Sequence, residues 1–391
     1  QLSASAFFIA YGIVSLPAAM LVSRIRSVPS ILAALCTMIV GCLIMLLAAN
    51  LAIYPLVLLG LFVLASGITV LQVAANPLAA ALGDPRYSHL RLTLSQAFNS
   101  FGTFLGPLLG AALFLQGVEV KDGASISATA RADALAGIDA AYLWISGLIA
   151  ILALFFFLAR RTVSAAAPVP SDEVSRRGLG AVLGDALSSR WAVLGAAAIF
   201  LYVGAEVAIG TQMALFLNSD GIWGRSDAPF GVPLLGWAMV SDGVPGVSLQ
   251  EAGYAVAFYW GGALVGRFVG AYLLRVIAPA KVLMAVAGAA VLLILLSANT
   301  SGAISGWSLL AIGLANSIMF PTIFSLASEG LGKRAAEGSG IICMAIVGGA
   351  LVPFAQGALA DAMGVQISFL LPAACYAFIL YFGMRYAAMY R

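Results

Sequence analysis

The sequence predicts an all-α polytopic membrane protein built from two similar helical halves. Hydrophobic residues make up 62% of the 391 positions and charged residues only 9%, and the mean hydropathy is +1.05. A soluble domain has no means of burying this much apolar surface inside itself. The net charge of +3 is too small to indicate a nucleic-acid partner. The lipid bilayer is therefore the expected solvent for most of the chain.

Apolar runs of about 20 residues, the length of one helical crossing of a bilayer, follow one another along the chain. Each run is expected to form a helix, because lipid offers the backbone no other hydrogen-bond partner. Several runs contain glycine or proline, which membrane helices tolerate when neighbouring helices satisfy the backbone. In chain order, the eleven expected helices cover residues 2–22, 29–49, 54–82, 92–116, 139–160, 191–217, 251–274, 281–298, 303–329, 336–362 and 367–388.

The basic residues predict how these helices are oriented. Of the 19 Lys and Arg residues, fifteen lie in alternate connections, three lie in the opposite connections, and Arg267 lies inside a run. Connections rich in Lys and Arg stay in the cytoplasm, so the first run is expected to enter from outside and the C-terminus to be cytoplasmic. The fifteen are Arg24, Arg26, Arg86, Arg91, Arg160, Arg161, Arg176, Arg177, Arg190, Arg275, Lys281, Lys333, Arg334, Arg385 and Arg391, and the three are Lys121, Arg131 and Arg225.

The longest basic connection, residues 161–190, is rich in Ala, Pro, Ser and charge and predicts a cytoplasmic linker between two halves. Five expected helices precede it in residues 1–160, and six follow it in residues 191–391. Two halves of six helices, with both termini inside, would need one more helix before Gln1. We therefore expect a twelve-helix fold of which the sequence contains eleven helices and lacks the first.

An internal repeat supports two equivalent halves. Residues 67–83 and 313–332 each begin with Gly, carry a central Pro and end in Leu-Gly. The three matches are separated by 246, 244 and 249 residues, and Pro107 and Pro353 are again 246 residues apart. These nearly equal offsets predict parallel repeats related by an axis along the membrane normal. Such an arrangement places ligand sites near the midplane between the halves.

Glu206 is the first candidate for a functional residue. It is a lone carboxylate about 15 residues into the run 191–217, which corresponds to about 22 Å at 1.5 Å per residue. A charge at that depth costs roughly 2.5–3.5 kcal/mol, so an intramembrane acid is a functional-site hypothesis by default. A carboxyl group there can carry a proton across with a substrate. The alternative is a structural acid that pairs with an arginine of another helix.

Neutral amides form a second group of candidates. Gln72 and Asn76 are spaced i and i+4, and Gln96 and Asn99 are spaced i and i+3, so each pair shares one face of its helix. Amides both donate and accept hydrogen bonds, which suits a ligand covered in hydroxyl groups; contacts between helices are the alternative. Asn76-Pro77 also predicts a local helix break that would free a carbonyl group. Asn316 is a weaker candidate in the second half.

Other residues have structural explanations. Arg267 is expected to reach the cytoplasmic interface or to form a gating contact. Aromatic side chains such as Tyr11 and Tyr259 are expected to pack, with stacking on a ligand ring as the alternative. Small residues at Gly102, Gly106 and Gly110, and at Gly348 and Gly349, predict close helix approach.

The sequence offers no support for catalysis, a metal site or a cofactor beyond a coupling ion. Its only histidine, His89, lies in a connection rather than in a run. The cysteines show no metal-ligand spacing and are interpreted as buried small hydrophobic residues. They are Cys36, Cys42, Cys343 and Cys375.

Four segments carry a resemblance to a known family. Residues 65–77 (ASGITVLQVAANP) and 91–102 (RLTLSQAFNSFG) resemble the fucose:proton symporter family of the major facilitator superfamily. Residues 202–207 (YVGAEV) and 320–326 (FPTIFSL) are similar to its glucose/galactose transporter branch. The resemblance extends over essentially the whole chain and implies the major facilitator fold.

The resemblance implies import of a neutral hexose such as glucose or galactose, usually with a proton, by a monomer in the cell membrane. By position, Gln96 and Asn99 match residues of the family that contact sugar, and Glu206 matches the acid of the glucose/galactose branch. Fucose symporters carry a glutamate at the position of Gln72 and a tyrosine at that of Phe320, so both departures favour the glucose/galactose branch. A uniporter, a sodium-coupled carrier, an exporter of another metabolite and a non-transporting sugar sensor remain alternatives.

Overall fold

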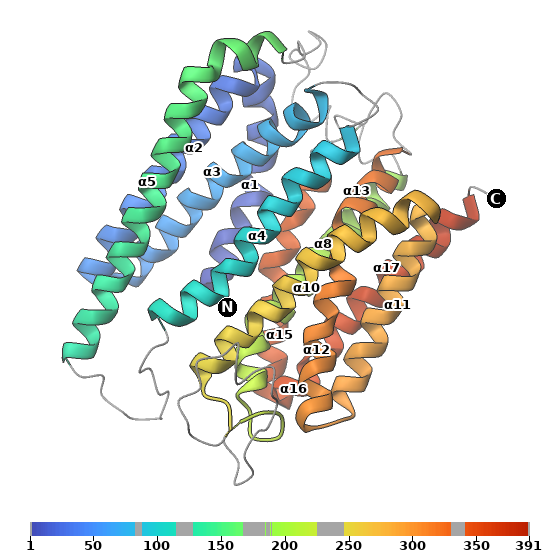
Figure 1. Cartoon of the computed structure of the whole chain (residues 1–391). Helices are drawn as coiled ribbons and strands as arrows, with labels where there is room; N and C mark the ends of the chain where they lie inside the picture. Colours follow the sequence, from blue (N-terminus) through green and yellow to red (C-terminus); the bar gives the residue numbers. More distant parts are fainter. Residues whose placement is uncertain are drawn as a thin grey trace.

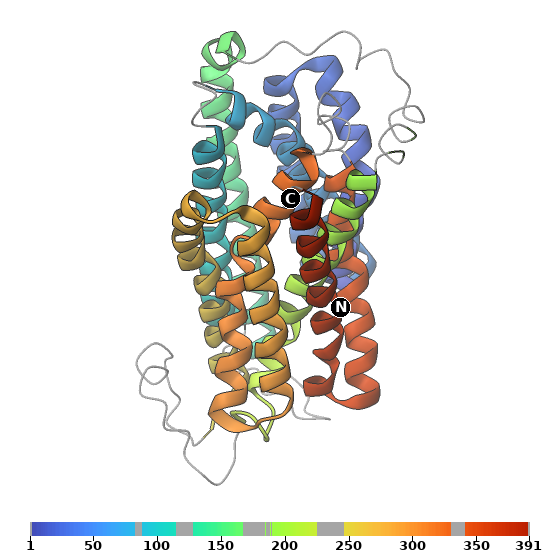
Figure 2. The same cartoon turned by 90° about the vertical axis from the view of Figure 1, so that its right-hand side faces the viewer.

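The computed structural model describes residues 2–82, 88–114, 128–166, 190–224, 246–329 and 341–389, with Gly184 and Ser188 as single positions. Within these ranges all regular structure is helical, as the sequence predicts. The N-terminal helices, blue to green in Figure 1, lie on one side of the bundle, and the C-terminal helices, yellow to red, lie on the other. The view turned by 90° shows the same long, roughly aligned helices (Figure 2).

The N-terminal half contains five helices, of which α5 differs most from expectation. α5 has 39 residues and extends beyond both ends of the expected run 139–160. Residues 161–166, expected at the start of the linker, are therefore helical, and most of the remaining linker lies outside the described residues. The five helices are α1 (Leu2–Ile25), α2 (Ser27–Leu51), α3 (Tyr54–Ala81), α4 (Ser88–Phe114) and α5 (Ala128–Ala166).

The C-terminal half begins with α8, and clear end signals mark two of its helices. Ser248 caps α10, because its hydroxyl accepts from the backbone N–H of Glu251 while the Glu251 carboxylate accepts from that of Ser248. Pro279 opens α11, where a missing N–H costs nothing. The elements are α8 (Arg190–Leu217), α10 (Leu249–Val276), α11 (Pro279–Ala298), α12 (Gly302–Asn316), α13 (Met319–Glu329), η3 (Ala345–Val347), α15 (Gly348–Met363), α16 (Val365–Ser368) and α17 (Leu370–Met389).

Ten segments in the described part of the chain are long and apolar enough to cross a membrane. Each coincides with one of the expected runs, and α12 and α13 together make one of them. The remaining expected run, 92–116, corresponds to α4, whose two ends carry side chains outside the described residues. The described helices therefore follow the order of the expected runs.

Two expectations about helix continuity were wrong. The run 303–329 is interrupted at Ser317 and Ile318, which form a turn between α12 and α13. Conversely, α3 continues through Asn76 and Pro77 to Ala81. Pro77 lies within the last turns of its helix, so only one backbone hydrogen bond near the end is lost and the helix persists. The repeat in the sequence therefore does not produce the same break in both halves.

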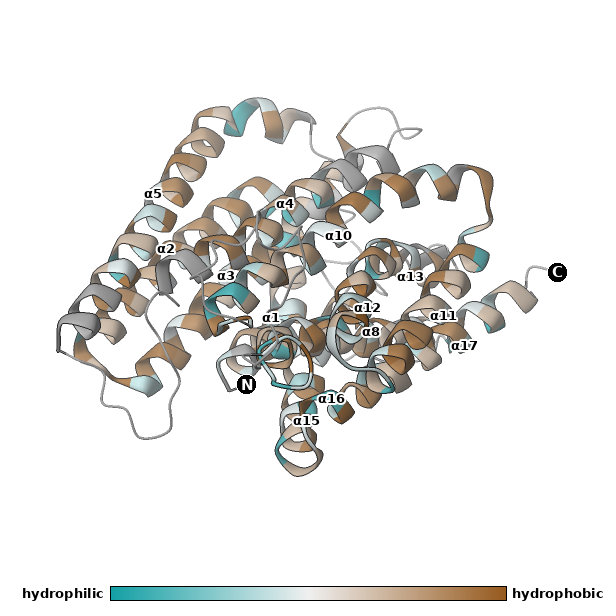
Figure 3. Cartoon of the chain, turned by 60° about the horizontal axis from the view of Figure 1, so that its bottom comes forward, coloured by the Kyte–Doolittle hydropathy of each residue, from teal (hydrophilic) through white to brown (hydrophobic). Residues whose placement is uncertain are grey.

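The outer helix surfaces are apolar. Figure 3 shows hydrophobic residues along most of each helix, including α5. On α5 the side chains of Trp144 and Leu158 are 74% and 71% exposed. Exposed apolar surface on this scale is normal only where lipid is the solvent. Inside, the C-terminal half contains a large core that includes Tyr202 and Phe216, and the N-terminal half contains a smaller one around Ile31 and Leu35.

Glycines permit close helix contacts in the C-terminal half. A Cβ atom at Gly313 would fall on the main-chain carbonyl of Tyr259, and one at Gly348 on that of Phe200. The close approach expected at Gly348 is therefore confirmed. The close helix approach expected at Gly102, Gly106 and Gly110 on α4 was wrong, because a Cβ atom at these glycines would meet no atom of the described residues within 4 Å. Small residues alone do not bring a second helix to that face.

The two halves meet along two seams. One joins α1 to η3 and α15, where the Ser5 hydroxyl donates to the main-chain oxygen of Ala350 at 2.9 Å. The other joins α4 to α10, which run side by side in Figure 1. α8 lies in the interior of the C-terminal half, where it contacts α10, α13, α15 and α17. The helix that carries Glu206 is thus surrounded by protein on several sides.

Candidate functional site

Glu206 lies in the middle of α8 and is half-buried. The Tyr202 hydroxyl, one turn earlier on the same helix, donates to Glu206 Oε1 at 2.8 Å. The spacing i and i+4 places the two side chains on one helix face. The expected lone carboxylate therefore has a hydroxyl partner on its own helix.

The Tyr202 hydroxyl has a second acceptor at the helix break. Asn316 is the last residue of α12, and its main-chain oxygen lies 3.0 Å from the Tyr202 oxygen. The last carbonyl groups of a helix have no donor within that helix, so they need partners from elsewhere. Tyr202 provides such a partner and links α8 to the turn between α12 and α13.

Two further tyrosines hold the side chain of Asn316. Its Nδ2 donates to the Tyr259 hydroxyl at 2.6 Å, and the Tyr376 hydroxyl donates to its Oδ1 at 2.7 Å. The Tyr259 hydroxyl in turn donates to the main-chain oxygen of Glu206 at 3.1 Å. We call these five residues the Glu206 network: Tyr202, Glu206, Tyr259, Asn316 and Tyr376.

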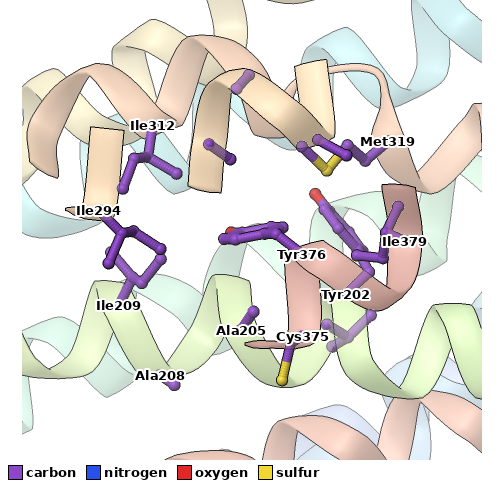
Figure 4. Close-up of a cluster of buried hydrophobic side chains, with 14 of the residues drawn as sticks. Tyr202, Ala205, Ala208, Ile209, Ile294, Ile312, Met319, Cys375, Tyr376 and Ile379 are labelled. Atoms are coloured by element: carbon purple, nitrogen blue, oxygen red, sulfur yellow. The ribbon is translucent and has the colours of Figure 1, made fainter. Parts of the chain in front are cut away.

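The Glu206 network is enclosed by apolar side chains. In Figure 4, Tyr202 reaches from α8 toward Met319 at the start of α13, and the ring of Tyr376 lies between α8 and the helices opposite. The three tyrosines are at most 1% exposed. Burying an unpaired hydroxyl is costly, and the hydrogen bonds of the network remove that cost. Each of the three tyrosine hydroxyls therefore has a hydrogen-bond partner in its apolar surroundings.

Arg267 lies on α10 at the seam with α4. Its Nη1 donates to the main-chain oxygen of Gln96, so the guanidinium joins the two halves directly. Within the described part of the chain the Glu206 carboxylate is bonded to Tyr202 rather than paired with a cation. Arg267 thus lies where the two halves meet. Its gating role stays a prediction.

Removing the Arg267 donor is expected to loosen the seam. A hydrogen bond from a charged donor is worth about 1.5–3 kcal/mol. Arg267→Met should therefore raise the equilibrium constant for separation of α4 from α10 by roughly tenfold or more. Spin labels at Phe98 and Phe268, which are 72% and 62% exposed, would report this as a shift to longer distances. Arg267→Lys keeps a donor and serves as the control. An unchanged distance distribution in Arg267→Met would contradict the expectation.

The structure does not bring all the amide candidates together. Gln72, half-buried on α3, donates through Nε2 to the Tyr11 hydroxyl on α1 at 3.2 Å. Gln96 is half-buried, Asn99 is exposed, and the side chain of Asn76 lies outside the described residues. Asn316 alone among the amides belongs to the Glu206 network. Their contacts with a ligand stay predictions.

Sequence reasoning missed the tyrosines of the network. Tyr202 carried a detectable signal, because it precedes Glu206 by four residues. Tyr259 was interpreted as a packing residue, and it does lie against Trp260 with ring centroids 5.0 Å apart; its hydroxyl contacts were not foreseen. Tyr376 offered no signal, since it is one aromatic residue in an apolar run 170 positions from Glu206.

Comparisons with known proteins agree with the fold. A model of the Major Facilitator Superfamily matches residues 1–345. The chain is 44% identical over 379 residues to a glucose/galactose transporter of Brucella abortus biovar 1 (strain 9-941), which covers 97% of this chain and 83% of that protein. It is 31% identical over 397 residues to the L-fucose-proton symporter of Escherichia coli (strain K12), with 97% and 83% covered.

A crystal structure of the E. coli fucose:proton symporter FucP matches 98% of this chain and 90% of its own, with a TM-score of 0.75 and 28% identity. The resemblance seen in the sequence is thereby confirmed over nearly the whole length. Because the family model and these relatives each match most of its residues, the chain belongs to the Major Facilitator Superfamily and is a multi-pass membrane transporter, not an enzyme.

Proposed function

We propose that this transporter imports a neutral hexose of the glucose or galactose type together with a proton, by alternating access of one site to the two sides of the membrane. The observation that carries the proposal is the carboxylate of Glu206, held by Tyr202 in the interior of a membrane helix. Relatives described as a glucose/galactose transporter and an L-fucose-proton symporter support the substrate class.

Glu206 suits proton coupling because its charge is costly where it lies. A charged side chain in the centre of a membrane helix costs about 2.5–3.5 kcal/mol, and a proton removes that cost. A carboxyl group that takes a proton from outside and releases it inside links each cycle to the proton gradient. Arg267 lies on α10, which packs against α8, and it supplies the positive charge that we propose balances the carboxylate once the proton has left.

The amides are the proposed sugar contacts. Each hydroxyl of a hexose donates and accepts hydrogen bonds, and a carboxamide offers both functions without adding charge. Gln96, on α4, lies at the seam with the C-terminal half, as a site between the halves requires. The proposed set comprises Gln72, Asn76, Gln96, Asn99 and Asn316. In the described structure Gln72 is bonded to Tyr11 and Asn316 to two tyrosines, so a sugar would exchange with these partners.

The distribution of basic residues supports a cytoplasmic C-terminus in the inner membrane, and we propose a monomer as the functional unit. A single cysteine introduced after Arg385 should react with a membrane-impermeant maleimide only in inside-out vesicles. Labelling in right-side-out vesicles would show that the C-terminus lies outside and would contradict the proposed orientation.

Uptake of labelled glucose by the full-length protein in proteoliposomes tests the proposal. An inward proton gradient should drive accumulation that a protonophore collapses. Accumulation driven only by a sodium gradient would indicate a sodium-coupled carrier, and uptake that merely equilibrates would indicate a uniporter. Gradient-driven export would indicate an exporter, and binding without flux a sugar sensor. Labelled galactose and fucose, used as competitors, would rank the substrates.

A further inference from the structure

The Tyr202 hydroxyl has one proton and two acceptors. Its oxygen lies 2.8 Å from Glu206 Oε1 and 3.0 Å from the main-chain oxygen of Asn316. A phenol donates one hydrogen bond. When Glu206 is ionised, both neighbours are pure acceptors, and the hydroxyl can fully satisfy only one of them. A charged acceptor forms the stronger bond, so the proton of Tyr202 is then committed to the carboxylate.

Protonation of Glu206 resolves the competition. The carboxylic acid has an O–H of its own and donates it to the Tyr202 oxygen, which accepts through a lone pair. Tyr202 is then free to donate to the Asn316 carbonyl. One proton gained at Glu206 therefore reverses the direction of the first hydrogen bond and completes the second. No heavy atom has to move for the exchange to occur.

The second acceptor lies at a point where the fold can respond. Asn316 ends α12, and α13 begins at Met319 after the turn at Ser317 and Ile318. The side chain of Asn316 is anchored by Tyr259 and Tyr376, and both of these bonds persist whichever form Glu206 adopts. Its main-chain oxygen, in contrast, receives the bond from Tyr202, which depends on Glu206.

We propose that Tyr202 is the positioning residue that transmits protonation of Glu206 to the break between α12 and α13. The inference rests on the proposed coupling role of Glu206 and adds the element on which the proton acts. In the protonated form α8 and the end of α12 are joined, and in the ionised form they are released. Proton binding thereby changes how α8 and α12 are joined within the C-terminal half, which forms one side of the proposed site between the halves.

Other charged or titratable groups reach Glu206 from the elements packed around it. In the described residues these are Tyr202 on α8, Tyr259 and Arg267 on α10, and Tyr376 on α17. Tyr259 bonds to the main chain of Glu206 and Tyr376 to the side chain of Asn316. Arg267 donates to the main-chain oxygen of Gln96. Tyr202 is therefore the group in the network that contacts both the carboxylate and the end of α12.

The test is the pH dependence of D-glucose binding to the full-length transporter in nanodiscs. If sugar binds only the protonated, joined form, its apparent affinity falls about tenfold per pH unit above the midpoint. Glu206→Gln should abolish this dependence, because nothing titrates. Tyr202→Phe should also give an affinity that changes less than about twofold over the same range, although Glu206 still titrates. Tyr376→Phe removes a hydroxyl from the same network and should keep the wild-type slope.

The outcomes separate the inference from the proposed function. A flat profile in Glu206→Gln together with a wild-type slope in Tyr202→Phe would overturn the role of Tyr202 and leave proton coupling intact. A wild-type slope in Glu206→Gln would overturn the coupling role of Glu206 itself. A uniform loss of affinity in Tyr202→Phe, with its slope preserved, would show a merely structural role and would also overturn the inference.

A spectroscopic measurement covers the case in which Tyr202→Phe does not fold. With ring-labelled tyrosine, the infrared difference between high and low pH should contain a tyrosine C–O band together with the carboxylic-acid band of Glu206. Both bands should be absent from Glu206→Gln. A carboxylic-acid band without any tyrosine band in the wild type would contradict the exchange of hydrogen bonds.

Discussion

Glu206→Gln is expected to abolish accumulation of the sugar while sparing its exchange across the membrane. Gln has nearly the shape of Glu, and its side-chain oxygen can still accept from Tyr202, so the Glu206 network should stay folded. The Gln side chain does not ionise, so it cannot bind a proton on one side of the membrane and release it on the other. The proton gradient therefore cannot drive transport through this residue. For one proton per sugar, a gradient of one pH unit corresponds to about tenfold accumulation, and the variant should lose all of it.

The measurement compares concentrative uptake with counterflow of labelled glucose in proteoliposomes. Glu251→Gln is the matched control, because Glu251 is a buried acid of the C-terminal half whose carboxylate caps α10 rather than bonding Tyr202. The control should lose some stability but retain accumulation. Normal concentrative uptake by Glu206→Gln would refute proton coupling at this residue.

Gly313→Ala is expected to destabilise the C-terminal half severely. The added Cβ atom would fall on the main-chain carbonyl of Tyr259, which is backbone and has no rotamer to change. Forcing a methyl group into packed structure costs typically about 1–3 kcal/mol, and a backbone obstacle places this site at the upper end. Moving α10 from α12 would also pull the Tyr259 hydroxyl from Asn316 Nδ2. Stability and transport should therefore fall together.

Gly288→Ala on α11 provides the comparison, because a Cβ atom there meets nothing within 4 Å. It should be neutral or stabilising by about 0.5–1 kcal/mol, since Ala loses less conformational freedom than Gly in a helix. Thermal unfolding of the two purified variants, measured as the yield of monodisperse protein after heating, gives the change in stability that each substitution causes. Equal stability of the two variants would show that α10 and α12 separate more easily than their packing indicates.

The helices were predictable from the sequence because lipid imposes a strong local rule. Each crossing needs about 20 apolar residues and satisfies its own backbone, so the eleven expected runs could be placed by length and hydropathy. The break after Asn316 was not predictable in this way. The segment around it, Gly302–Phe324, is apolar enough to form one continuous crossing, and the donor to the main-chain oxygen at the end of α12, Tyr202, comes from α8.

The proline at position 77 shows the opposite error. Pro removes a backbone donor wherever it occurs, but whether the helix breaks depends on how many turns follow and on what packs around it. α3 ends at Ala81, so little helix remains beyond Pro77 to be displaced. The glycines of α4 failed as a packing signal for a related reason: a small residue permits contact, yet a partner helix must also be present.

By itself, the sequence determined the solvent, the helical class and the order of the spans, and it marked Glu206 as a lone carboxylate in an apolar run. These follow from local composition and from the cost of placing a charge in lipid. Only the tertiary structure decided how Glu206 and its α8 neighbour Tyr202 are joined to the other helices. Tyr259, Asn316 and Tyr376 come from three other helical segments, α10, α12 and α17, and hydrogen bonds between segments depend on distances of about 3 Å that no spacing along the chain encodes.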